Sequence, residues 1–322
     1  MQAFLCALLA VSLAPWAAAD DIEIGPDYHD APELRERGEV PKGEIRHFVM
    51  KSKDSRIYKG IAKGQRGKVP YERKVAVYIP QQLDRKKPAP FIIAQDGSWY
   101  HDVLPKSLNS LIHEERVPAM VAIMIDSGGG DAQGSQRGLE YDTLSDTYAD
   151  FVEKEVLPRV EKECDLRLTT DPEARATMGG SSGAAAAFTM AWYCPERYRR
   201  VLSYSGTYCN QQSPVSRRTP HGAWEYHENL IPRSKRKPLR IWLHVSEQDN
   251  GHDRDDSSFH NWVRANRLMA EELKNKEYAY RFVFSRKSGH VDGRVTRQTL
   301  PGALEWLWKG YPETPAAEAP AS

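Results

Sequence analysis

The sequence has no excess of charge of either sign and no internal repeat. Its 45 Lys and Arg residues balance 44 Asp and Glu residues, which leaves a formal net charge of +1. This balance gives no electrostatic reason to expect nucleic acid or an anionic membrane as a partner. The lack of repeats argues against a solenoid or a propeller. The chain of 322 residues is long enough to bury a large core, so we expect a globular fold that acts on a small or neutral molecule.

An apolar run over residues 4–16 is too short to span a bilayer comfortably. Three alanines, ending at Ala19, precede Asp20 and fit the small-residue pattern of a signal cleavage site. We predict a signal peptide over residues 1–19, a secreted or periplasmic mature chain, and no stable membrane association. An N-terminal membrane anchor is the alternative, because no Lys or Arg precedes the run.

Cysteine is scarce, and no CxxC or Cys/His spacing typical of zinc occurs. Cys164, Cys194 and Cys209 belong to the predicted mature chain. An oxidising compartment permits a disulfide, and an odd count leaves at least one thiol over. We favour a bridge between Cys194 and Cys209; three buried free thiols are the alternative.

Strand-like and helix-like segments alternate through most of the chain. Strands are expected at residues 75–79, 90–94, 120–125, 175–178, 200–204, 240–245 and 280–284. Helices are expected at residues 103–115, 144–163, 183–193, 259–276 and 300–309. Strands separated by helices predict an α/β fold, with a mainly parallel, twisted sheet and helices on both of its faces.

Three segments depart from this alternation. The polar residues 20–74 are expected to form an N-terminal extension with the first antiparallel strands, and residues 312–322 a disordered Pro/Ala/Glu tail. Residues 210–237 are long for a loop and rich in aromatic and basic side chains, so we expect them to overhang the site. The catalytic domain is predicted over residues 75–311.

A possible nucleophile lies in Gly179-Gly180-Ser181-Ser182-Gly183, which has the pattern G-x-S-x-G. An expected strand precedes this pattern and a helix rich in alanine follows it, which is the context that the nucleophile elbow of α/β-hydrolases requires. Glycines at both ends remove side chains that would clash where the chain reverses. We therefore predict that Ser181 is a nucleophile; the alternative is a Gly/Ser-rich turn without a catalytic role.

A serine hydroxyl needs a general base and an orienting acid, which in this fold follow the serine as Asp or Glu and then His. Asp249 lies in the loop after the strand expected at 240–245, and His290 follows the strand expected at 280–284. We assign Asp249 as the acid and His290 as the base. Glu247 and Asp253 are the alternatives for the acid.

Backbone N–H groups should stabilise the oxyanion that forms when the serine attacks. One is expected from Ser182, the residue after the nucleophile, and the other from Gly97 or Ser98 in the loop after the strand at 90–94. An ordinary Asp-Gly turn is the alternative for that loop. The acidic run at residues 252–256 lacks the spacing of a calcium loop. No metal and no cofactor are predicted.

The motifs together resemble the putative-esterase family. That family includes enterochelin-esterase-like hydrolases, S-formylglutathione hydrolases, feruloyl and acetyl-xylan esterases, and mycolyltransferases. The resemblance covers about residues 75–311. In chain order, the motifs that carry it are Gln95-Asp96-Gly97, Arg137-Gly138-Leu139-Glu140-Tyr141, Tyr148-Ala149-Asp150-Phe151 to Glu155-Val156-Leu157-Pro158, Gly179 to Gly183, Ser246 to Asp249, and Gly289-His290.

The resemblance implies a single α/β-hydrolase domain and carries the triad roles to Ser181, Asp249 and His290. It also implies that Arg137 and Glu140 lie near the site, where Arg137 would hold a substrate oxygen. A structural ion pair is the alternative for these two residues. Ala184 departs from the second glycine that is common after the elbow, which puts a siderophore substrate in doubt more than the chemistry.

Aromatic and basic residues predict a substrate cleft with aromatic walls and polar contacts rather than a deep apolar tunnel. The residues concerned are Trp99, Tyr100, Trp224, Tyr226, Arg217, Arg218 and His221. We therefore predict a serine carboxylic-ester hydrolase that acts on a polar, aromatic or carbohydrate-linked ester. The alternative functions are an acyltransferase on the same scaffold and a non-catalytic binding protein. For the aromatic and basic residues listed above, the alternative is ordinary loop packing and surface charge. The oligomeric state is not predicted.

Overall fold

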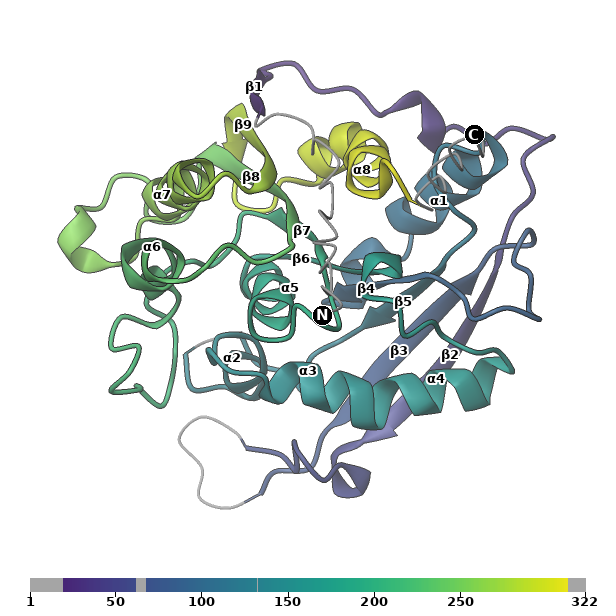
Figure 1. Cartoon of the computed structure of the whole chain (residues 1–322), viewed down its shortest axis with the longest axis horizontal. Coiled ribbons are helices and arrows are strands. Elements are labelled where there is room, and N and C mark those ends of the chain that lie inside the picture. Colours follow the sequence, from purple (N-terminus) through teal and green to yellow (C-terminus); the bar gives the residue numbers. More distant parts are fainter. Residues whose placement is uncertain (1–19, 62–67, 132, 312–322) are drawn as a thin grey trace, which may run out of the picture.

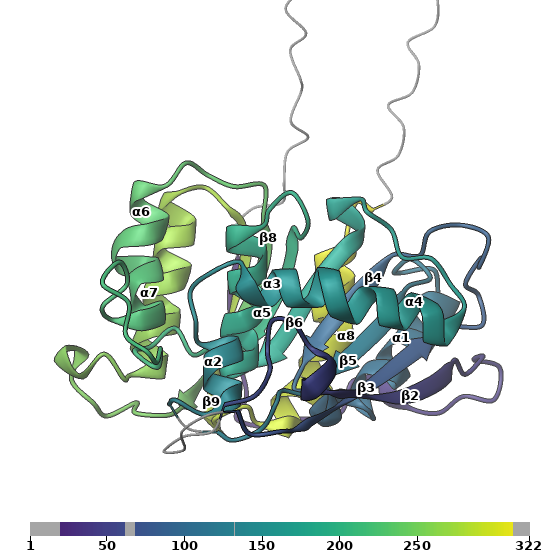
Figure 2. The same cartoon turned by 90° about the horizontal axis from the view of Figure 1, so that it is seen from below.

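The computed structural model describes residues 20–61, 68–131 and 133–311. The predicted signal peptide and the predicted C-terminal tail lie outside these residues. The described residues form one twisted sheet between two layers of helices (Figures 1 and 2). Its strands are β1 (Asp20–Ile24), β2 (Glu44–Lys51), β3 (Glu72–Ile79), β4 (Phe91–Gln95), β5 (Val121–Ile125), β6 (Arg175–Gly180), β7 (Arg200–Tyr204), β8 (Arg240–Gln248) and β9 (Ala279–Gly289).

The α-helices alternate with these strands. They are α1 (Val103–His113), α2 (Gln136–Tyr141), α3 (Thr147–Phe151), α4 (Leu157–Cys164), α5 (Ser182–Tyr193), α6 (Ile231–Arg233), α7 (Trp262–Asn275) and α8 (Gly293–Trp308). Two π-helical turns, η4 (Val152–Val156) and η7 (Tyr226–Leu230), occur among them. The 3₁₀ turns are η1 (Pro32–Leu34), η2 (Ser52–Asp54), η3 (Gly97–Tyr100), η5 (Pro172–Ala174), η6 (Gly222–Trp224) and η8 (Asp256–Ser258).

The strand order in the sheet is β1-β9-β8-β7-β6-β4-β5-β3-β2. From β1 to β5 neighbouring strands run parallel, whereas β3 pairs antiparallel with both β5 and β2. All residues of β4, β5, β6 and β7 are buried, as expected for parallel strands with both faces covered. The sheet is therefore the mainly parallel, twisted α/β sheet that the sequence predicts.

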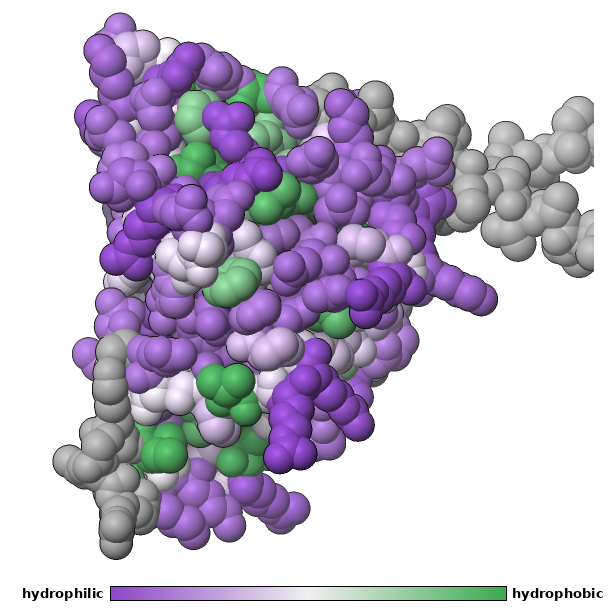
Figure 3. Space-filling view, turned by 90° about the vertical axis from the view of Figure 1, so that its left-hand side faces the viewer, coloured by the Kyte–Doolittle hydropathy of each residue, from purple (hydrophilic) through white to green (hydrophobic). Residues whose placement is uncertain are grey.

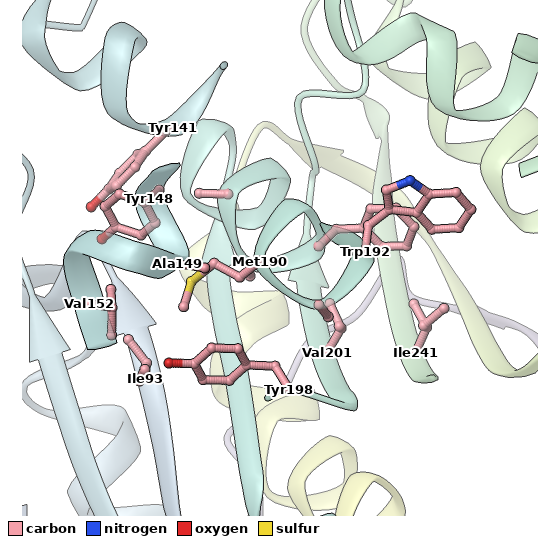
Figure 4. Close-up of a cluster of buried hydrophobic side chains, with 14 of the residues drawn as sticks. Ile93, Tyr141, Tyr148, Ala149, Val152, Met190, Trp192, Tyr198, Val201 and Ile241 are labelled. Carbon is pink, nitrogen blue, oxygen red and sulfur yellow. The ribbon is translucent and has the colours of Figure 1, made fainter. Parts of the chain in front are cut away.

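Each face of the sheet has its own hydrophobic core. On one face Ile92, Ala94 and Met178 pack with side chains of α1 and α8. On the other face the strands pack against the helical segments from α3 to α5 and against α7. Figure 4 shows part of this second core, where Ile93, Val201 and Ile241 of the strands lie near Met190 and Trp192 of α5. The small side chains of residues 184–187 are buried, so α5 lies close to the central strands.

The N-terminal segment differs from the sequence-based expectation. β2 is antiparallel to β3 as expected, but β1 pairs in parallel with β9 at the opposite edge of the sheet. The short polar strand could not reveal this partner, because the contact joins residues more than two hundred positions apart. The helix predicted at 144–163 begins at Thr147 and includes the π-turn η4 between α3 and α4.

The segment 210–237 is not a lid in its middle part. Tyr226 is fully buried, its ring packs against Phe188 and Trp192 of α5, and its hydroxyl lies 2.7 Å from Thr189 Oγ1. Aromatic side chains in a long loop can thus belong to the core instead of to a binding surface.

The predicted disulfide is also wrong. Cys164, Cys194 and Cys209 are buried free thiols, and burial raises the pKa of Cys194 to about 11, which keeps that thiol protonated. Among the described helices, none combines the length and the apolar character needed to cross a bilayer.

Candidate active site

Ser181 lies at a tight turn between β6 and α5. Its backbone has φ 58° and ψ −129°, a sparsely populated conformation for a residue with a side chain that costs on the order of 1–3 kcal/mol. A Cβ at Gly179 would lie 2.4 Å from the backbone of Gly183, and a Cβ at Gly180 would lie 2.8 Å from Val291. The three glycines of G-G-S-S-G therefore let the chain reverse and leave the serine side chain at the turn.

Hydrogen bonds to β7 and the loop after it hold this strained turn. The Ser181 N–H donates to the carbonyl of Tyr204 at 2.9 Å, and the Thr207 N–H donates to the carbonyl of Ser181 at 3.1 Å. The strain at Ser181 is thus fixed by backbone groups from a neighbouring strand, as expected where a site is pre-organised.

The structure brings Ser181, His290 and Asp249 together from three separate strands. The Ser181 Oγ atom lies 2.9 Å from Nε2 of His290, and Nδ1 of His290 lies 2.6 Å from Oδ1 of Asp249. The serine follows β6, the acid follows β8, and the histidine follows β9. Because these strands are parallel neighbours on the two sides of β7, their carboxyl ends meet at one edge of the sheet.

Asp249 is buried and well supplied with hydrogen bonds. Its side chain accepts the N–H groups of Asn250 at 2.8 Å and Ser246 at 3.2 Å. Burial alone would raise the pKa of Asp249, but His290, together with Ser205 and Asn250, outweighs that effect and keeps the pKa below its ordinary value. The carboxylate is therefore ionised and accepts the Nδ1–H of His290, which leaves Nε2 free to accept the serine proton.

The other two candidate acids are not in reach of the histidine. Glu247 lies on the surface, where it forms an ion pair with Arg286 at 2.8 Å and accepts the N–H of Lys287. Asp253 is exposed in the loop that follows. The geometry therefore singles out Asp249.

Several supporting residues carry no sequence motif. Thr207 Oγ1 lies 3.3 Å from Ser181 Oγ and accepts the indole N–H of Trp262 at 3.2 Å. The Trp262 ring packs edge-on against His290 with centroids 6.2 Å apart. Ser205 accepts the N–H of Val291, the residue that follows the histidine. Ser205 and Thr207 lie in the loop after β7, and Trp262 is the first residue of α7, so only the tertiary structure reveals them.

The two backbone N–H groups that the sequence assigns to the oxyanion have no hydrogen-bond partner among the described residues. They belong to Ser182, the first residue of α5, and to Gly97 in the loop after β4. A Cβ at position 97 would lie 2.3 Å from the backbone of Met124, so only glycine fits there. By contrast, the Ser98 N–H already donates to Asp126 at 2.8 Å, which leaves Gly97 as the loop's available donor.

Arg137 and Glu140 each form ion pairs within the protein, which favours the structural alternative over a role in substrate binding. Glu140 is buried and its carboxylate pairs with the buried Arg73 at 2.6 Å. Arg137 forms hydrogen bonds through Nε and Nη2 with Asp96 and an ion pair with Asp131. These partners occupy both carboxylate oxygens of Glu140 and three of the five N–H groups of Arg137. The Arg137–Asp96 pair instead holds the residue that precedes Gly97.

The predicted aromatic and basic wall is only partly accessible. Trp99 is 58% exposed, and Arg217 and Arg218 are also exposed. Tyr100, Trp224 and Tyr226 are buried, and Trp224 packs against His227 and Phe259. Trp99 thus stays a candidate for substrate contact, whereas Trp224 belongs to the packing of its loop.

One group of side chains in the described residues has the composition and proximity of a metal site, and it consists of His221, Glu225 and Glu228. It shares no residue with the Ser181–His290–Asp249 chain. The arrangement at Ser181 thus joins a hydroxyl, an imidazole and a buried carboxylate by two short contacts.

A protein-family profile described as "Putative esterase" matches residues 68–307. Among solved structures, an enterobactin esterase from Shigella flexneri is 24% identical over 83% of this chain and 59% of that chain, with a TM-score of 0.59. A feruloyl esterase module from Clostridium thermocellum, complexed with sinapinate, is 14% identical over 92% and 97% of the two chains, with a TM-score of 0.58. The chain spans about three fifths of the enterobactin esterases that it matches. No curated protein sequence matches the chain.

Proposed function

We propose that the protein is a serine carboxylic-ester hydrolase, because the chain belongs to the Putative esterase family and has an α/β-hydrolase-type fold. Family and fold both support ester hydrolysis. One observation carries the serine mechanism. It is the chain of two short contacts that joins Ser181 Oγ to His290 Nε2 and His290 Nδ1 to Asp249.

In the proposed reaction, Ser181 Oγ attacks the ester carbonyl carbon while its proton passes to Nε2 of His290. The carbonyl oxygen becomes an oxyanion that accepts the N–H groups of Gly97 and Ser182. His290 then returns the proton to the alcohol oxygen as the carbon–oxygen bond breaks, which leaves an acyl group on Ser181. Water attacks this acyl-enzyme with His290 as base, and the serine is regenerated with its proton as the carboxylic acid leaves.

We propose a polar ester with an aromatic or carbohydrate part as substrate. Trp99 is exposed and lies two residues beyond Gly97 in the chain, so its indole offers an apolar surface on the turn that carries the proposed oxyanion donor. Two structural neighbours support an aromatic acyl group, because the feruloyl esterase module is complexed with sinapinate and a Shigella flexneri enterobactin esterase was crystallised in the presence of 2,3-dihydroxy-N-benzoyl-glycine. A screen of feruloyl, acetyl-sugar, short-acyl and long-acyl esters should show the lowest activity on the long acyl chains. A preference for the long chains would exclude this substrate class.

The serine mechanism is tested by labelling with a fluorophosphonate probe and mass spectrometry. Wild type should gain one adduct on Ser181 and lose its esterase activity. Ser181→Ala should show neither adduct nor turnover, a loss on the order of 10⁶-fold, while its circular dichroism stays unchanged. Ser182→Ala is the matched control and should still be labelled. An active Ser181→Ala variant would refute the mechanism. Addition of acceptor alcohols to the assay separates hydrolysis from acyl transfer, because a transferase would form the new ester.

We also propose that residues 1–19 are a signal peptide and that the mature protein is secreted or periplasmic. The apolar run and the alanines before Asp20 support this proposal. N-terminal sequencing of the protein recovered outside the cytoplasm should begin at about Asp20. Recovery of the full-length chain in the membrane fraction would favour an anchor instead.

A further inference from the structure

A second group of reactive side chains lies outside the proposed active site, on the segment that contains η6 and η7. It consists of His221, Glu225 and Glu228. Their spacings of four and three residues are those that place side chains on one side of a helical segment. The surface that carries α6 and α7 is mostly hydrophilic, with hydrophobic residues in small separate groups (Figure 3). Nothing in the proposed ester hydrolysis uses these three residues.

The distances in this group do not suit hydrogen bonds. Nδ1 of His221 lies 3.6 Å from Oε1 of Glu225 and 3.6 Å from Oε2 of Glu228, and all three ligand atoms lie within 4.8 Å of one another. A tetrahedral ion with bonds of about 2.0–2.1 Å to nitrogen and oxygen separates its ligands by about 3.3–3.4 Å. Both distances from the imidazole nitrogen are therefore close to the separation of neighbouring ligands of such an ion.

The burial and the charge of these three side chains also favour a bound cation. Nδ1 of His221 is buried and has no hydrogen-bond partner, and an unsatisfied polar atom of this kind is costly. Glu225 is only 4% exposed, yet neither it nor Glu228 forms an ion pair with a lysine or arginine in the described parts of the chain. A bound divalent cation would satisfy the nitrogen and neutralise both carboxylates.

The ligands are also held in place by their neighbours. The His221 ring stacks on Phe259 with centroids 3.9 Å apart and an interplanar angle of 13°. Glu225 accepts the side-chain amide of Asn229, and its other oxygen accepts the His221 N–H at 3.3 Å. Such outer contacts fix ligand orientation in metal sites.

We propose that His221, Glu225 and Glu228 bind Zn²⁺. One imidazole nitrogen and two carboxylate oxygens suit this ion and leave a fourth position for water. Calcium is a poorer fit because it takes six to eight oxygen ligands. Since Phe259 belongs to the loop after β8 that also carries Asp249, the ion would fasten the 210–237 segment beside that loop. The proposed site is structural and independent of the ester chemistry.

The test is isothermal titration calorimetry of the untagged full chain, after treatment with a chelator, with Zn²⁺, Ca²⁺ and Mg²⁺ in separate runs. We expect one Zn²⁺ per chain and no comparable binding of Ca²⁺ or Mg²⁺. Co²⁺ should give the visible absorption of a tetrahedral site, and Zn²⁺ should raise the melting temperature.

Three variants make the test specific. Glu228→Gln and His221→Gln should each weaken Zn²⁺ binding by at least about tenfold, the lower limit seen when even outer-shell residues of metal sites are changed. Glu271→Gln, an exposed glutamate on α7, is the matched control and should bind as wild type does. Circular dichroism checks that each variant is folded. If wild type binds no Zn²⁺, or binds it no more tightly than folded Glu228→Gln, the proposal is wrong and the group is an ion-pair cluster only.

Discussion

Two polar regions lie close together in this molecule and differ in how their groups are used. Around α2, the carboxylate of Glu140 accepts hydrogen bonds from Arg73, Gln136 and the Gly128 N–H, so both of its oxygens are occupied. At the edge of the sheet where β6 and β9 end, the His290 side chain is 23% exposed, and the N–H groups of Gly97 and Ser182 have no partner among the described residues.

The difference separates structural charges from reactive ones. Buried charges that saturate one another hold elements in place, and removal of one partner leaves an uncompensated charge. A polar group with an unused donor or acceptor at an accessible edge can instead serve a substrate. The sequence places charged residues in both regions, but only their hydrogen-bond partners show which region does chemistry. Three changes test this contrast, from the largest expected effect to the smallest.

The first change is Asp249→Asn in the reactive region. An amide cannot hold His290 in the required tautomer or stabilise the imidazolium, so kcat should fall on the order of 10⁴-fold. Glu247→Gln, two residues away on the surface, should keep nearly all activity because its partners are Arg286 and Lys287. Steady-state kinetics on a short ester compare the two variants. The opposite ranking would assign the acid to Glu247.

The second change is Glu140→Gln in the structural region. It leaves the buried Arg73 guanidinium without its counter-charge, so the free energy of unfolding should fall by about 3–5 kcal/mol. Urea denaturation measures this loss, and kcat per folded molecule should stay near that of wild type. Glu36→Gln, which breaks an exposed pair with Lys42, is the control and should change little. A Glu140→Gln variant with wild-type stability and a low kcat would mean that Glu140 takes part in the active site.

The third change concerns Asp142, which lies between the two regions. Burial raises its pKa to about 7, against the opposing hydrogen bond with the Ser182 hydroxyl. The folded state therefore binds a proton that the unfolded state releases near pH 4. This bound proton stabilises the folded state below about pH 4, and the stabilisation is lost as the pH rises through about 7. Over that range the free energy of unfolding falls by up to about 1.4 kcal/mol per pH unit.

Asp142→Asn removes this titration, because an amide does not ionise. Urea denaturation at several pH values from about 4.5 to about 7.5 should show a flatter pH dependence of the unfolding free energy in the variant than in wild type. Equal slopes in the two proteins would mean that Asp142 is ionised in the folded state.

Much of the fold and the main functional residues could be predicted from local patterns. Strands β3 to β9 lie where short apolar runs predict them, and their separation by helices predicts the parallel order. Ser181 stands out because G-x-S-x-G follows a strand and precedes a small-residue helix. The family match agrees with the resemblance drawn from the motifs. Residues that must occupy a fixed local geometry leave such a signal.

The sequence by itself determined the alternation of strands and helices, the turn at Ser181 and the two loops that carry the acid and the base, because each of these segments depends on residues that are close in sequence. Only the tertiary structure decided the partner of β1, the free state of Cys194 and Cys209, and the pairing of Glu140 with Arg73. It also revealed Thr207 beside the serine, and Trp262 in contact with Thr207 and His290. These features depend on which distant segments the sheet order brings together, and no local pattern of residues encodes that order.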